Sequence, residues 1–466
     1  MSSTTATTLP DEKLDFKRIL PIFIIVLIDL LGLTVIIPLL PLYSAGFGAT
    51  PLMIGIIGAT YPVFQFIGAP VLGRLSDRYG RRPILLLSQV GTLIGFLILG
   101  FASSLWMILL ARMIDGISGA NIATAQAAIT DSTNEKTRTQ GLGLLGAAFG
   151  LGFVAGPIIA FISLSISGNN FHVPAFIAAF FSLASIVLTW LWLPETLPAE
   201  RRGTDNGQKP TFSFRALFQA LAHPQVGLLL VLIFTQQLAF GGFEQLLSLF
   251  TLNRLGLSAA GNAIIFVFVG IIVVIVQGGL LGRWSRKYGD RKLIFAGLGL
   301  LAAGMIMTAL TPSIPPPGYS QAELQAQLTA SGDFRTHENP TTRNLAVALP
   351  DDEQNGWLGL TVILAAMIPA SIGGGILQPS INSLITKRID LLEVGGMLGI
   401  SAALLSAANA IAPLIGGLLF QAIGPAAPFL IGGLMLLALL VVALKKLKPG
   451  SEASVPVRMT RVANSH

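Results

Sequence analysis

Stretches of about twenty apolar residues follow one another along this chain, and they limit the folds that it can adopt. An α-helix needs about 20 such residues to cross the hydrocarbon core of a bilayer. Only 11% of the residues are charged, compared with about 25% in an average soluble protein. The sequence therefore predicts an all-α membrane protein with twelve transmembrane helices. The predicted spans are 19–43, 52–72, 83–101, 105–128, 140–163, 173–193, 225–251, 260–281, 292–311, 356–385, 395–420 and 425–444.

The basic residues predict how these spans are oriented. With a cytoplasmic N-terminus, every Lys and Arg is cytoplasmic except Arg254, Arg335 and Arg343, which lie outside, and Arg112, which lies within a span. An excess of Lys and Arg is typical of cytoplasmic loops. We therefore expect a multi-pass protein of the cell (inner) membrane with both termini in the cytoplasm. The basic residues behind the net charge of +7 are explained by their role in orienting the spans, so no nucleic-acid partner is expected.

A repeated motif divides the chain into two homologous parts. Residues 73–82 recur as residues 282–291, and Ile129-Thr130 recurs as Ile385-Thr386. Internal repeats are typical of secondary transporters, whose substrate site lies where the repeats meet. We therefore predict two pseudo-symmetric six-helix bundles. The expected divisions are a cytoplasmic tail at 1–18, a bundle at 19–193, a cytoplasmic linker at 194–222, a second bundle at 223–446 with an extracytoplasmic insertion at 312–354, and a cytoplasmic tail at 447–466. The insertion is expected to be a solvated loop with room for a short helix at 320–328.

Three motifs in the first part resemble those of a known family. Gly73-Arg-Leu-Ser-Asp77-Arg-Tyr-Gly80-Arg81-Arg82-Pro83 resembles the loop 2–3 signature of the major facilitator superfamily. Arg112-x-x-x-Gly116-x-x-Gly119-Ala120 resembles its fourth-helix motif, and Gly146-x-x-x-Gly150-x-x-x-x-x-Gly156-Pro157 its drug-antiporter motif. Together with Asp29-x-x-Gly32 and Pro38-x-x-Pro41, the set is most similar to drug:proton antiporters of the tetracycline-efflux type. The resemblance implies alternating access of two bundles around a central site.

A charged cluster at the cytoplasmic helix ends is predicted to act in gating. Asp77 and Arg81 are four residues apart, and Asp131 ends span four on the same side. Such a carboxylate can pair with arginine or cap a helix N-terminus. The resemblance implies that the cluster latches the two bundles in one state; a cluster that only orients the chain is the alternative. Because Arg286 stands where the first copy has Asp77, we expect the second latch to be degraded.

Glycines and a proline complete the predicted gating set. Gly73 and Gly80 have no side chain, so helix ends and a tight loop can pack closely there. Gly156 fits the small-residue pattern of close helix contacts, and Pro157 predicts a kink. Ordinary helix packing is the alternative for this pair. The expected gating residues are Gly73, Asp77, Arg81, Asp131, Gly156 and Pro157.

Four charged residues lie within the predicted spans: Asp29, Arg112, Asp115 and Glu244. Each costs about 2.5–3.5 kcal/mol near the bilayer centre, so such residues usually face a cavity and act there. Burial disfavours an ionised carboxylate, which makes Asp29 the first choice for the proton carrier. Glu244 is the second choice, or else the counter-charge of a cationic substrate. Arg112 is expected to tune a carboxylate or relay the coupling, with a static Arg112–Asp115 pair as the alternative.

Polar and aromatic residues in the spans predict a central cavity for an amphipathic molecule. Sites for drug-sized ligands are mostly apolar with few polar anchors. We therefore expect proton-coupled efflux of hydrophobic or amphipathic drugs. The Gln236-Gln237 pair keeps open a carrier of a sugar, a metabolite or a lipid. At 100° per residue, Gln126 is expected to share one face of span four with Arg112. The expected lining residues are Tyr61, Gln65, Gln126, Gln237, Phe240, Glu244, Gln277, Gln378 and Asn382.

Other classes of protein find less support in the sequence. No HExxH, GxSxG or P-loop pattern occurs, which disfavours a membrane enzyme. The chain has no Cys and only four scattered His, so no metal or cofactor is expected. A passive channel or a receptor stays open, although embedded Asp29 and Glu244 favour coupling. The expected partners are a small-molecule substrate, protons and the lipid bilayer, and the chain is expected to act as a monomer.

Overall fold

The computed structural model describes residues 16–119, 121–133, 137–203, 214–330, 345–389 and 394–447, and every regular element in these ranges is helical. The helices of the first part are α1 (Phe16–Ile36), α2 (Leu40–Gly46), α3 (Pro51–Tyr79), α4 (Arg81–Gly100), α5 (Leu105–Ser118), α6 (Asn121–Asp131), α7 (Arg138–Ile166), α8 (His172–Trp192) and η1 (Ala199–Arg201). The later ones are α9 (Phe214–Leu221), α10 (Gly227–Leu255), α11 (Ala259–Val274), η2 (Ile275–Leu280), α12 (Leu281–Tyr288), α13 (Asp290–Ala309), α14 (Gln321–Ala330), α15 (Leu358–Arg388), α16 (Val394–Ala422) and α17 (Ala427–Lys446).

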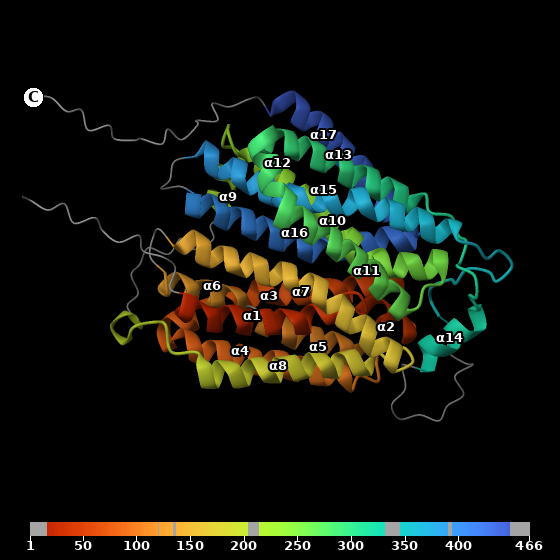
Figure 1. Cartoon of the computed structure of the whole chain (residues 1–466), viewed down its shortest axis with the longest axis horizontal. Coiled ribbons are helices and arrows are strands. Elements are labelled where there is room, and N and C mark those ends of the chain that lie inside the picture. Colours follow the sequence, from red (N-terminus) through yellow and green to blue (C-terminus); the bar gives the residue numbers. More distant parts are fainter. Residues whose placement is uncertain are drawn as a thin grey trace, which may run out of the picture.

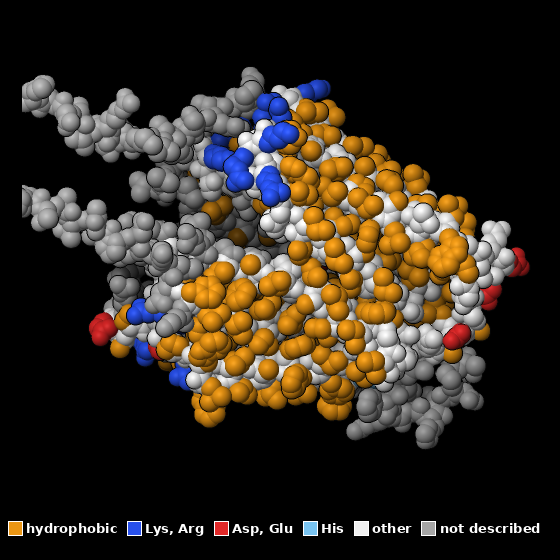
Figure 2. Space-filling view, viewed as in Figure 1, with side chains coloured by type: hydrophobic (Ala, Val, Ile, Leu, Met, Phe, Trp, Pro, Cys, Tyr) orange, Lys and Arg blue, Asp and Glu red, His pale blue; other side chains and the backbone are white. Residues whose placement is uncertain are grey.

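Eleven helical stretches in the described ranges are long and apolar enough to cross a membrane. They coincide with eleven of the predicted spans. The range predicted for the fourth span holds α5 and α6 instead of one helix, and Ala120 between them lies outside the described residues. Hydrophobic side chains cover much of the surface between the two ends of the molecule (Figure 2). Exposed large hydrophobic residues include Trp106, Ile166 and Leu191. Such a surface suits contact with lipid.

Two further spans are interrupted. The first, expected to run through residue 43, ends at Ile36 because Pro38 has no backbone N–H and the residue before it is biased away from helical backbone. The break leaves the Pro38 carbonyl free to accept a hydrogen bond from Ser248 Oγ of α10, at 2.8 Å. The eighth span winds as a π-helix at η2 (Ile275–Leu280). Such segments are rare and often mark functional sites.

The helices gather in two halves, α1–α8 on one side and α10–α17 on the other (Figure 1). Contacts of α3 with α16 and of α7 with α11 join the halves. Glycines allow backbones to meet at these crossings, as is common between membrane helices. A Cβ on Gly417 would lie 2.6 Å from the Pro51 carbonyl oxygen, and one on Gly55 would collide with the Pro413 carbonyl.

The two ends of the molecule differ. Within the described ranges, the hydrogen bonds between the halves all lie at the end that carries α2 and α14, hereafter the α14 end. Besides Ser248 with Pro38, the Leu52 amide donates to Gln421 Oε1 at 3.1 Å. At the opposite end, near α6 and α9, the surface is hollowed between the halves beside a group of Lys and Arg side chains (Figure 2). The halves are thus joined at one end and parted at the other.

The insertion at 312–354 forms an ordered cap over its described residues, with α14 where a short helix had been expected. Asp352 Oδ1 accepts from the Gln321 amide at 2.7 Å, which caps the N-terminus of α14. The Tyr319 hydroxyl donates to the Pro350 carbonyl at 3.0 Å, and burial raises the pKa of Tyr319 to about 12. Leu324 and Leu328 are buried. The described parts therefore differ from a solvated loop.

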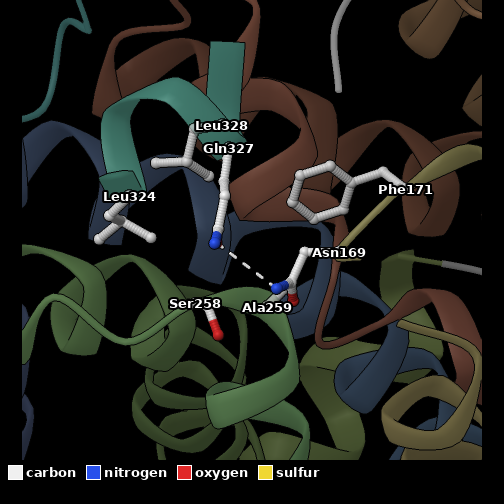
Figure 3. A pocket seen from close by; sticks show the side chains of 7 residues that line it. All are labelled: Asn169, Phe171, Ser258, Ala259, Leu324, Gln327 and Leu328. Carbon is white, nitrogen blue, oxygen red and sulfur yellow. Dashed lines mark hydrogen bonds between the residues drawn. The ribbon is translucent and has the colours of Figure 1, made fainter. Parts of the chain in front are cut away.

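The cap of α14 also reaches the first half of the chain (Figure 3). Asn169, in the loop after α7, donates from Nδ2 to Gln327 Oε1 at 3.4 Å. Its Oδ1 accepts from the amide of Ala260 in the first turn of α11, at 3.2 Å. Asn169 is the non-glycine residue with positive φ, 64°, in the described ranges, and asparagine tolerates this left-handed conformation better than most residues. One side chain thus connects α14, α11 and the first half.

Candidate functional site

A buried ion pair lies within α5. Arg112 Nη1 is 2.8 Å from Asp115 Oδ2, and the two side chains are 7% and 4% exposed. The Arg112 guanidinium also lies over the Tyr61 ring of α3, 4.5 Å from its centroid. Gly116 and Gly119 allow α3 this close, since a Cβ on Gly116 would lie 2.6 Å from the Tyr61 carbonyl oxygen. The glycines of the motif therefore position an aromatic ring over the arginine.

Tyr61 and Gln65, two of the predicted lining residues, lie beside this ion pair. Gln65 Nε2 donates to the Gly119 carbonyl at 2.8 Å and to Tyr61 Oη at 3.2 Å. Both side chains are half-buried. Tyr61, Gln65, Arg112 and Asp115 thus form one cluster, and the pairing of Arg112 with Asp115 also fits a static role.

Asp29 lies in a small pocket inside the first half. The pocket is bounded by α1, α4 and α6, and Asp29 and Gln89 are its polar residues. The other lining residues are Ile25, Val26, Leu30, Leu85, Ile122 and Ala125. A carboxylate among apolar side chains is costly when ionised. Gln89 was not among the predicted residues, because an uncharged amide in an apolar span gives no signal of its own.

Glu244 occupies the corresponding region of the second half, on α10. Its side chain is half-buried, and within the described ranges its carboxylate makes no hydrogen bond or ion pair. One turn before it, Phe240 stacks on Phe243 with centroids 6.1 Å apart and packs on Gly374 of α15. Gln237 Nε2 donates to Asn409 Oδ1 of α16 at 2.7 Å. Asn409 is a polar partner that the sequence did not single out.

The remaining predicted lining residues lie further apart. Gln277, in the π-helical turn, is exposed and donates to the Gly375 carbonyl at 3.3 Å. Asn382 accepts from Ser401 Oγ at 3.1 Å, and Gln378 is half-buried. Gln126 is exposed on α6. The prediction that Gln126 shares a helix face with Arg112 is wrong, because α5 ends at Ser118 and Gln126 belongs to the next helix.

The predicted gating charges meet at the end opposite α14. Arg81 lies 2.6 Å from Asp77 Oδ1 and 2.9 Å from Asp131 Oδ2, and its Nη1 donates to Ser76 Oγ at 2.7 Å. The Arg81 side chain is 8% exposed. All four residues belong to the first half, on α3, α4 and α6. In this conformation the cluster joins helices of one half, and its described contacts do not reach the other half.

A carboxylate that the sequence reasoning missed holds the loop beside this cluster. Glu195, just after α8, accepts from the amides of Arg81 and Leu197 at 2.8 and 2.9 Å. The amide of Arg82 donates to it at 3.3 Å. Glu195 therefore caps the N-terminus of α4, where free amides and the helix dipole favour an anion. An acid directly after an apolar span, on the side of a basic loop, was the available signal.

The two glycines of the loop motif differ. Gly80 has φ +109°, and a Cβ there would collide with the Glu195 carboxylate. A Cβ on Gly73 would meet nothing within 4 Å. The expectation of close packing is therefore met at Gly80 and wrong at Gly73, which lies inside the long helix α3 instead of at its end.

The second copy of the motif keeps the cluster with its charges exchanged. Asp290 stands where the first copy has Arg81, and Lys387 follows the Ile385-Thr386 repeat as Asp131 follows Ile129-Thr130. Lys387 Nζ lies 2.5 Å from Asp290 Oδ2, and the hydroxyls of Ser285 and Ser383 donate to Asp290 at 2.5 and 2.6 Å. Reasoning from Arg286 alone did not predict this ion pair, and the degraded latch between the halves stays a prediction.

Gly156 and Pro157 lie in α7, which packs on both halves. A Cβ on Gly156 would collide with Thr34 of α1, and Thr34 Oγ1 donates to the Gly152 carbonyl at 2.9 Å. On α11, a Cβ on Gly270 would lie 3.2 Å from the Phe153 carbonyl oxygen. The motif thus sets the distance between α1 and α7, next to a crossing between the halves.

Long apolar helices in two halves, with charged groups embedded in them and a repeat that relates them, define a multi-pass membrane transporter. Residues 22–322 and 354–463 match the family model of the Major Facilitator Superfamily, and the chain belongs to this superfamily.

Curated relatives confirm the resemblance to tetracycline resistance proteins. The class B protein of Escherichia coli is 31% identical over 339 residues, which cover 70% of this chain and 83% of that protein. The class D protein of Salmonella ordonez is 28% identical over 439 residues, which cover 92% and 97%. The crystal structure of the human organic anion transporter MFSD10 (TETRAN) has a TM-score of 0.60 at 22% identity, covering 92% of this chain and 99% of that one. The similarity to MFSD10 concerns the fold alone.

Proposed function

We propose that this protein is a proton-coupled exporter of hydrophobic or amphipathic compounds. It has twelve spans in two six-helix bundles, with α5 and α6 forming the fourth span and both termini in the cytoplasm. The bundles alternate between states that open to one side of the cell (inner) membrane and then to the other. The relatives named for tetracycline resistance support this substrate class. The group of Lys and Arg at the end opposite α14 supports the cytoplasmic assignment of that end.

The observation that carries the proposal is the pair of embedded carboxylates, Asp29 and Glu244, one in each half. A carboxylate within a span is costly, which favours a group that takes up a proton or meets a cationic ligand. Arg112 and Asp115 neutralise each other at 2.8 Å. Three of the four embedded charged residues are acidic and one is basic, which favours cationic or zwitterionic substrates over anions. Asp29 carries the proton, and Glu244 faces the substrate.

The unequal ends support alternating access. In this conformation the halves meet through hydrogen bonds and glycine contacts at the α14 end and part at the other. With the assigned orientation, the site is open to the cytoplasm. Opening to the outside requires the contacts of Pro38, Leu52 and Asn169 to separate.

The test is substrate-induced proton movement in proteoliposomes that contain a pH-sensitive dye. Lipophilic cations and tetracycline-like compounds should release protons from the wild type, and Asp29→Asn should abolish that release while substrate binding persists. Glu244→Gln should weaken binding of cations more than that of neutral compounds. Thr235→Val, at an exposed hydroxyl of α10 that bonds its own helix, is the control. Proton release that persists in Asp29→Asn would remove Asp29 from the carrier role.

A carrier of a polar solute is the second candidate, because buried amides occupy the second half. Gln237 bonds Asn409, and Asn382 bonds Ser401, in the region where a sugar or metabolite would need donors and acceptors. In the same assay, a response to sugars or metabolites without a response to drugs would establish this alternative. It would leave the fold and the gating charges unchanged.

A further inference from the structure

Gln89 of α4 holds a fixed orientation inside the first half. Gln89 is 1% exposed, and its Nε2 donates to Ser185 Oγ of α8 at 2.7 Å. Ser185 Oγ donates in turn to the Ile25 carbonyl at 3.3 Å. A hydroxyl has one proton, so Ser185 can only accept from Gln89. The amide nitrogen of Gln89 therefore points to Ser185, and its oxygen Oε1 points away.

Gln89 Oε1 is a buried acceptor without a hydrogen-bond donor in the described part of the chain. A buried polar atom left in this state costs about 1–3 kcal/mol, so native structures rarely keep one without a partner. Gln89 lines the pocket that Asp29 also lines, and the rest of that lining is Ile, Val, Leu and Ala. Asp29 is the titratable residue of this lining.

We propose that Gln89 is a positioning residue for the proton carrier, and that its Oε1 accepts a hydrogen bond from the protonated carboxyl of Asp29. The inference rests on the proposed function and names the group that holds the carrier in its neutral form. A protonated carboxyl donates one hydrogen bond, whereas an ionised one only accepts. Gln89 therefore stabilises only the protonated state of Asp29. When Asp29 loses its proton, the carboxylate and Gln89 Oε1 are both acceptors and repel each other.

The charged groups around Asp29 are consistent with this role. On α3 and α5, the Tyr61 ring packs on Arg112, whose charge is matched by Asp115. The helices α7 and α8 also pack on α1, and residues 147–166 and 173–192 contain no titratable side chain. On α6 the nearest charge in sequence is Asp131, which is bound to Arg81. Gln89 is thus the polar residue that shares the lining of this pocket with Asp29.

Two substitutions at Gln89 should act in opposite directions. Gln89→Met keeps the length of the side chain and removes the acceptor, so protonation of Asp29 should require a lower pH. The pH midpoint of drug-driven proton release should fall by about 0.5–1 pH unit, the equivalent of one hydrogen bond. Gln89→Glu places a second carboxyl beside Asp29, and two carboxyls that share a proton lose it at higher pH. Its midpoint should rise.

The experiment measures these midpoints in proteoliposomes of the full chain and follows the carboxyl C=O infrared band that Asp29→Asn removes. Thr189→Val, which deletes another buried hydroxyl of α8 outside the pocket, is the control and should leave both readouts unchanged. Opposite shifts in the two Gln89 variants support the proposal. Unchanged midpoints in folded Gln89→Met and Gln89→Glu overturn it, even if the transport rate falls, because water would then satisfy Gln89. Proton coupling that survives Asp29→Asn would instead refute the carrier assignment of the proposed function.

Discussion

Exchanging the charges of Asp290 and Lys387 tests whether the second half keeps a working counterpart of the Arg81 cluster. The side chain of Asp290 is 2% exposed and lies 2.5 Å from Lys387 Nζ. In the first half, the buried position is Arg81 and the acid is Asp131. The double variant Asp290→Arg/Lys387→Asp would copy that arrangement. Ser285 occupies the place of Ser76 in the repeat, and its hydroxyl can donate to Asp or accept from Arg.

The size of the effect follows from burial. Two unit charges 4 Å apart interact by about 4 kcal/mol at an effective dielectric constant of 20. Lys387→Asp alone would turn this attraction into repulsion against a nearly inaccessible carboxylate. Since the Lys387 side chain is 49% exposed, solvent reduces the effect, and we expect each single reversal to destabilise the folded state by about 2–4 kcal/mol. The double variant should recover at least half of the summed loss.

The assay is thermal unfolding of the purified full chain in detergent, combined with transport in proteoliposomes. Arg286→Ala, at an exposed position of α12, serves as the control and should resemble the wild type. If the two reversals simply add in the double variant, the residues are not coupled. That result would refute the assignment of Asp290 and Lys387 as the charge-exchanged counterpart of Arg81 and Asp131.

Three further predictions concern the loop and the cap. Gly80→Ala should destabilise the protein by about 1–3 kcal/mol in thermal unfolding, because Gly80 has φ +109° and faces Glu195. Gly73→Ala should be neutral or mildly stabilising. Equal effects of the two substitutions would contradict this account. Glu195→Gln should cost about 1–2 kcal/mol by weakening the cap of α4, and an unchanged melting temperature would show that the cap contributes little. The chain has no cysteine, so the double variant Asn169→Cys/Gln327→Cys introduces a single pair of thiols. A short cross-linker between these two thiols should arrest transport, and cleavage of the linker should restore it. Undiminished transport in the linked protein would mean that α14 and the first half need not separate.

The parts of this structure that follow from local sequence were predictable. Apolar length located the spans, and helical spacing brought Arg112 to Asp115 and Asp77 to Arg81, since residues three or four apart share a helix face. Glu195 binds amides far away in the chain, and only the fold reveals that contact. The pairing of Asp290 with Lys387 was missed because the second copy of the repeat exchanges the charges. A search for the same residue types at matching positions of the two copies does not find it. Gln126 was misplaced because helical spacing was extended across a break in the fourth span.

The two ends of the molecule are built from different contacts, and this difference separates what their variants should do. At the α14 end, backbone oxygens and glycines of one half touch the other half, as at Pro38 and Gly417. At the opposite end, the clusters around Arg81 and Asp290 each bind helices of a single half. A contact that spans the halves changes the balance between conformations, because it exists in one of them only. A contact within one half can persist in both, so its loss lowers the stability of that half in each conformation. Variants at the α14 end should therefore alter transport with little change in melting temperature, while variants of the two charge clusters should lower the melting temperature first.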